Sequence, residues 1–146
     1  MRSERGYSAT PSTLAGVLRT RMLRYVITSP ADVDSVAKYA ARSDPAAIAA
    51  WLRAALSLDL TDQLPAIRAP LLEIVPFDSV IDPYQGFASR AAKAQAYTTW
   101  LSHAPNGSVQ MIDHSRHFVM FDQPVAFDDV RFAAIRRRTS ELAHGH

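Results

Sequence analysis

An alternation of strand-like and helix-like segments in the second half of the chain constrains the fold most. The run Leu71–Val75 is short, apolar and bounded by prolines, which is typical of a buried strand. A second strand-like run covers residues 109–113. Apolar residues at helical spacing predict a long helix over 83–102 between the two runs, and Pro124 begins a last helix. This order predicts an α/β fold with two parallel core strands and flanking helices.

The first part of the chain reads as helical throughout. Helices are predicted over 11–28, 30–42 and 45–57, and the last two begin at Ser29-Pro30 and Asp44-Pro45. The third is the clearest, because its apolar residues fill one helical face: Ile48, Trp51, Leu52, Ala55 and Leu56. We therefore divide the chain into an all-helical segment over 1–64 and an α/β segment over 65–146.

Composition excludes several classes of function. Hydrophobic residues make up 48% and charged residues 21%, as in globular proteins with a packed core. A net charge of +2 argues against nucleic acid or an anionic membrane as a partner. The chain has no cysteine, which excludes disulfides and a thiolate nucleophile. It also has no membrane-length apolar run and no apolar leader at its start, so we expect a cytoplasmic protein.

Titratable residues follow both predicted strands. Asp78 and Asp82 come after the first strand, and His114 and His117 come after the second. The carboxyl ends of parallel strands meet at one edge of a sheet, where functional groups gather. A carboxylate beside a histidine can orient the imidazole as a general base. Asp82 also has a purely structural interpretation, because Asp82-Pro83 is a favourable N-cap and N1 pair for the start of the long helix.

Two stretches resemble parts of the α/β-hydrolase family. Residues 67–78 resemble the late core strand that ends on the acid of the catalytic triad, and residues 109–124 resemble the last strand and catalytic-histidine loop. The most specific match is a histidine followed by an aromatic residue, then an acidic residue, an amide and a proline: His117, Phe118, Asp122, Gln123 and Pro124. The resemblance implies that His117 is the general base, that Asp78 orients it, and that residues 11–64 form a cap, or lid.

The sequence departs from that family in ways that bear on function. Arg116 precedes the histidine where the family usually has glycine, and Pro76-Phe77 stand where it usually has glycine near the end of the acid strand. No G-x-S-x-G elbow for a nucleophile is present, and Ser115 is not followed by the start of a helix. The Asp–His pair alone has no covalent chemistry to serve.

The sequence thus predicts an α/β-hydrolase-like, esterase-like protein that is inactive by itself. Its substrate would be a small ester if another chain supplied the serine. Two other hypotheses stay open. The chain could be a non-catalytic module that self-associates or binds another chain through an open sheet edge. It could also be the truncated product of an ordinary hydrolase gene.

No metal or cofactor is expected. His114 and His117 with Asp113 are three possible ligands, but a strand end and loop give them no fixed convergence, and no glutamate accompanies them as in a zinc protease. No glycine-rich phosphate loop is present either, which argues against a nucleotide cofactor.

Overall fold

The computed structural model describes residues 17–18 and 21–144. The chain divides into two compact units, the first ending at Ser57 and the second beginning at Leu58. The sequence predicts the boundary after residue 64. The division falls earlier because Leu64 packs against Leu101 and Ala104, which belong to the second unit.

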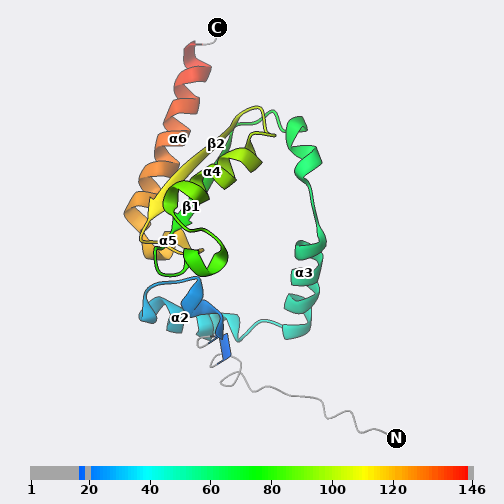
Figure 1. The fold of residues 1–146 in the computed structure, drawn as a ribbon, viewed down its shortest axis with the longest axis vertical. Helices are drawn as coiled ribbons and strands as arrows, with labels where there is room; N and C mark the ends of the chain where they lie inside the picture. Colours follow the sequence, from blue (N-terminus) through cyan, green and yellow to red (C-terminus); the bar gives the residue numbers. More distant parts are fainter. Residues whose placement is uncertain (1–16, 19–20, 145–146) are drawn as a thin grey trace, which may run out of the picture. The chain divides into compact units, whose positions relative to one another are not determined.

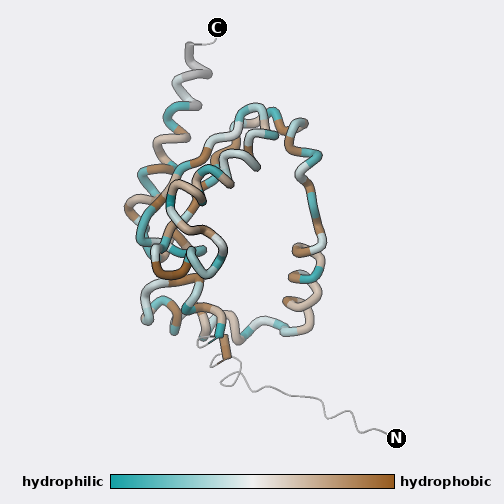
Figure 2. Tube along the Cα trace, in the orientation of Figure 1, coloured by the Kyte–Doolittle hydropathy of each residue, from teal (hydrophilic) through white to brown (hydrophobic). Residues whose placement is uncertain are grey.

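Two α-helices dominate the described part of the first unit. Helix α2 (Pro30–Ala40) begins as predicted, with the Ser29 hydroxyl accepting a hydrogen bond from the Asp32 N–H at 3.3 Å. Helix α3 (Pro45–Ser57) has the predicted bounds, and Asp44 Oδ1 accepts from the Ala46 N–H at 2.9 Å. None of the residues of α3 is buried, and tan and brown, the colours of apolar residues, predominate along it (Figure 2).

The helix predicted over 11–28 does not reach residue 28. Its first residues lie outside the described part of the chain. In the described part the α-helix ends at Arg21, and a 3-10 turn, η1 (Leu23–Tyr25), follows. The β-branched run Val26–Thr28 disfavours helix, and the proline after Ser29 disfavours it further.

The second unit is built on a pair of parallel strands. Strands β1 (Leu71–Phe77) and β2 (Gly107–Asp113) pair from Leu71↔Gly107 to Phe77↔Asp113. Helix α4 (Arg90–Leu101) forms the crossover between them, and helix α6 (Pro124–His144) follows β2 after a short helix, α5 (Val119–Asp122) (Figure 1). The predicted α/β arrangement of two parallel strands with helices packed against them is confirmed.

A small apolar cluster holds α4 against the start of the sheet. Leu101 and Ala104 are buried together with Leu64, which lies in the 3-10 helix η2 (Thr61–Ala66). Leu71 and Val109 pack against this cluster from the two strands. Because strand side chains alternate between faces, the neighbouring pair Leu72 and Ser108 projects from the opposite face of the sheet.

The long helix predicted over 83–102 is shorter than expected. The chain first makes a 3-10 turn, η3 (Asp82–Gln85), which ends at Gly86 in the left-handed region (φ 92°). Helix α4 then begins at Arg90, where the Ser89 hydroxyl accepts from the Ala92 N–H at 3.1 Å. The Asp82-Pro83 pair therefore starts the short turn and not the helix.

None of the described helices combines the length and the apolar character that a membrane crossing requires.

Candidate active site

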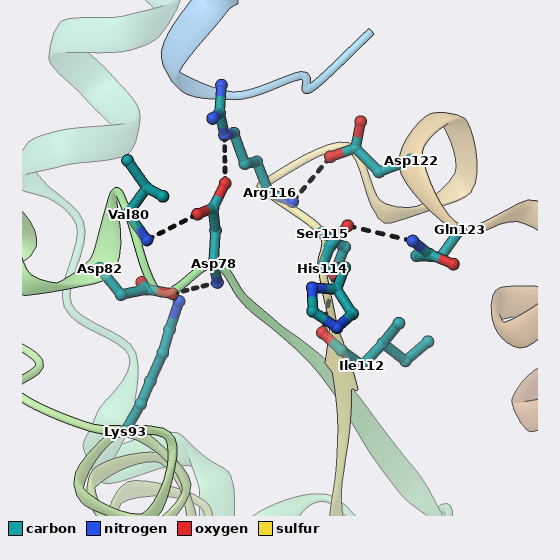
Figure 3. Close-up of polar contacts among 10 residues, drawn as sticks. All are labelled: Asp78, Val80, Asp82, Lys93, Ile112, His114, Ser115, Arg116, Asp122 and Gln123. Atoms are coloured by element: carbon teal, nitrogen blue, oxygen red, sulfur yellow. Dashed lines mark hydrogen bonds and ion pairs between the residues drawn. The ribbon is translucent and has the colours of Figure 1, made fainter.

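The two candidate loops leave neighbouring strands at the same edge of the sheet. Phe77 and Asp113 are the last paired residues of β1 and β2. Two residues after Asp113, the Ser115 N–H donates to the Phe77 carbonyl at 3.3 Å. Asp78 and the segment 114–117 therefore begin side by side, as the sequence predicts for parallel strands (Figure 3).

The Asp78 carboxylate is held by the neighbouring loop and by its own. Its Oδ2 accepts from Arg116 Nε at 2.6 Å, and its Oδ1 accepts from the Val80 N–H at 2.8 Å. The side chains of Asp78 and Arg116 are 12% and 19% exposed. Burial by itself would raise the pKa of Asp78. The hydrogen bond and positive charge of Arg116, with the backbone N–H groups of Val80 and Ile81, outweigh burial and lower that pKa.

His117 is exposed and follows Arg116 directly. Its ring meets that of Phe118 edge-on, with 5.0 Å between centroids. Among the described residues, no hydrogen bond joins His117 to Asp78. The structure thus brings Asp78 together with Arg116, the residue that stands where the resembled family has glycine.

Two residues of the histidine motif hold the loop in shape. Asp122 Oδ2 accepts from the Arg116 N–H at 2.7 Å, and Gln123 Nε2 donates to the His114 carbonyl at 3.1 Å. His114 itself has a positive φ of 54°, which is uncommon for a residue other than glycine. In the sequence alone, the acidic residue and the amide after the histidine form only a pattern. Their hydrogen bonds give that pattern a structural reason (Figure 3).

Asp82, the alternative acid, is buried in an ion pair with a residue that sequence reasoning did not single out. Asp82 Oδ1 accepts from Lys93 Nζ at 2.6 Å, and the two side chains are 4% and 6% exposed. Its Oδ2 accepts from the Asp78 N–H at 2.7 Å, so Asp82 also braces the backbone of the first candidate acid. Lys93 lies one turn into α4, and only the tertiary fold brings it to Asp82.

Two further titratable groups have shifted pKa values, and one of them, Tyr97, is close enough to Asp82 for its charge to act on it. Burial raises the pKa of the Glu73 carboxyl. Burial also raises the pKa of the Tyr97 phenol, and the negative charges of Glu73 and Asp82 raise it further.

Ser115 is fully buried. Its exposed fraction is 0%, and its hydroxyl donates to the Ile112 carbonyl at 2.8 Å. This geometry suits a structural hydroxyl and presents no nucleophile at the surface.

Within residues 17–18 and 21–144, no three His, Asp or Glu side chains come close enough together to hold a metal ion. His114, His117 and Asp113 therefore do not converge.

Comparisons of the chain with protein-family models, with curated proteins and with solved structures found no match.

Proposed function

We propose that this chain carries the acid and base of an α/β-hydrolase-like esterase site, with His117 as general base and Asp78 as its orienting acid. The observation that supports this is the strand register, which starts the Asp78 loop and the His117 loop at the same sheet edge. The chain contains no G-x-S-x-G sequence. In this proposal the nucleophile therefore comes from another polypeptide, and a small ester is the substrate.

The hydrogen bonds of Asp78 are compatible with this role. An ionised carboxylate offers about four acceptor positions. Arg116 and Val80 each use one of them. The carboxylate therefore keeps acceptor capacity for a hydrogen bond from His117, whose ring is exposed.

The first test is the state of the His117 ring in the full chain. A carboxylate partner keeps the proton of a neutral imidazole on one nitrogen. We expect ¹⁵N NMR to show a single tautomer of His117 in the wild type and a mixture in Asp78→Asn. His103 is a control in the same spectrum, because its Nδ1 lies 2.8 Å from the Trp100 carbonyl. An unchanged His117 in Asp78→Asn would remove Asp78 from the proposed role.

The second test is hydrolysis of 4-nitrophenyl acetate. The proposal expects the wild type and His117→Ala to show the same background rate, because the chain supplies no nucleophile. A wild-type rate that disappears in His117→Ala would mean that the chain is active alone. It would also direct attention to Ser115, whose hydroxyl would then have to leave its bond to Ile112.

A second candidate function is an interaction module that self-associates. In the described part of the chain the sheet has only two strands, so β1 and β2 each leave one edge without a strand partner. Such edges pair readily with another strand. Sedimentation velocity over a concentration series tests this candidate. A mass that stays at one chain over the whole series would exclude self-association.

A further inference from the structure

A groove lies at the end of the sheet opposite to Asp78 and His117. It has a volume of about 470 Å³ and is formed by the starts of β1 and β2 and the second half of α6. Its lining includes Leu72 and Ser108 from the sheet. A seven-residue strand is roughly 20 Å long, so the groove is separate from the candidate active site. The volume falls within the usual range for small-molecule sites.

The groove is lined by apolar side chains and by hydroxyl groups. Leu72 and Ile135 supply apolar surface, and Ile135 is 56% exposed although it lines a concave site. Ser108 and Thr139 add hydroxyls, but these donate to the carbonyls of Leu71 and Ile135 at 3.3 and 3.0 Å. The hydroxyl oxygens therefore remain as acceptors.

Arg137 is the cationic residue of this lining. None of the ion pairs among the described side chains involves Arg137, whereas Arg131 of the same helix pairs with Asp128 at 2.9 Å. A guanidinium beside apolar surface matches a ligand with an anionic head and an apolar tail.

We propose that this groove binds a medium-chain fatty-acid carboxylate. The carboxylate pairs with the Arg137 guanidinium, and the alkyl tail lies along Leu72 and Ile135. Charge complementarity selects the head group, and the apolar wall selects the tail. This site does not depend on the function proposed for Asp78 and His117.

The test is an NMR titration of the full chain with sodium decanoate, with decanol and acetate as matched probes. We expect decanoate to shift the amide resonances of residues 71–72, 107–109 and 134–139. Decanol should bind more weakly at the same residues, and acetate should leave them unchanged. Arg137→Gln should weaken decanoate binding about tenfold, the worth of a charge-assisted hydrogen bond, and should leave decanol binding unchanged.

Two control variants separate the head from the tail. Arg131→Gln removes a cation from the same helix outside the groove and should leave decanoate binding unchanged. Ile135→Ser should weaken decanoate and decanol alike. The proposal is overturned if decanoate shifts no groove resonance, or if Arg137→Gln and Arg131→Gln behave alike. It is also overturned if groove resonances move with protein concentration alone, because a second copy would then be the occupant.

Discussion

Arg116 Nε lies 2.6 Å from Asp78 Oδ2, and this ion pair joins the loops that follow two neighbouring parallel strands. Among the side chains that the structure describes, a second Arg–Asp pair has the same nitrogen–oxygen distance. It joins Arg90 to Asp113 at 2.6 Å, but there both side chains are 47% exposed. The two pairs therefore allow the effect of burial to be measured within one protein.

Removal of the Arg116 guanidinium should destabilise the fold more than removal of the Arg90 guanidinium. Arg116→Gln leaves the largely buried Asp78 carboxylate without its charged partner, which costs about 1–3 kcal/mol. Arg90→Gln breaks an exposed pair and should cost less than about 1 kcal/mol. Urea denaturation at neutral pH gives both free energies of unfolding. Equal losses for the two variants would show that the burial of the Asp78 pair has no energetic consequence.

The Asp78 ion pair should also make stability depend on acid pH. The folded-state pKa of Asp78 is below its ordinary value of 3.8. The unfolded chain therefore binds the proton more readily, and the stabilisation is fully present above the unfolded pKa and is lost as the pH falls through the folded one. The wild type should lose more stability than Asp78→Asn between about pH 5 and pH 2. Parallel curves for the two proteins over that range would contradict the lowered pKa.

Glu73 should have the opposite pH dependence. Burial raises the pKa of its carboxyl in the folded state, so the stability that this group contributes is present below the unfolded pKa and is lost as the pH rises through the folded one. Glu73→Gln should therefore stabilise the fold at neutral pH and have little effect in acid. The same variant should lower the pKa of Tyr97, because it removes one of the charges that raise it. Ultraviolet titration of the phenol measures this shift, and an unmoved Tyr97 would rule out the electrostatic contact.

The buried Asp82–Lys93 pair should show strong coupling. Lys93→Met leaves a buried carboxylate without its counter-charge, which costs about 3 kcal/mol or more. Asp82→Asn with Lys93→Met together should cost less than the sum of the two single changes, because neither charge then remains buried alone. A double-mutant cycle from urea denaturation measures this coupling. Strict additivity would mean that the pair contributes no net attraction.

Gly107 should be intolerant of a side chain for a steric reason. A Cβ at this position would lie 2.7 Å from Leu101 Cγ and 2.8 Å from the Leu101 carbonyl oxygen. Gly107→Ala should therefore cost about 1–3 kcal/mol through displacement of the α4 end. Gly86 is the comparison, since a Cβ there meets no atom within 4 Å and only its positive φ opposes substitution. A Gly107→Ala protein as stable as the wild type would show that Leu101 moves aside without cost.

Local pattern was enough to predict most of the elements. The proline-bounded run at Leu71 and the cap pairs at Ser29 and Asp44 signal their elements through short-range sterics and hydrogen bonds, and β1, α2 and α3 begin there. The start of α4 was predicted wrongly because two local signals compete. Asp82-Pro83 and Ser89 can each begin a helix. Gly86, in the left-handed region, ends the 3-10 turn that begins at Asp82, and α4 begins after Ser89.

The sequence by itself determined where the strands lie, that they run parallel, and that Asp78 and His117 follow their ends. Apolar periodicity and chain connectivity carry that information, and both are local. Only the tertiary structure decided which side chain holds each acid. Arg116 binds Asp78 across two loops and Lys93 binds Asp82 from α4. An ion pair depends on distances of a few ångströms between side chains, and packing sets those distances, not the spacing of residues along the chain.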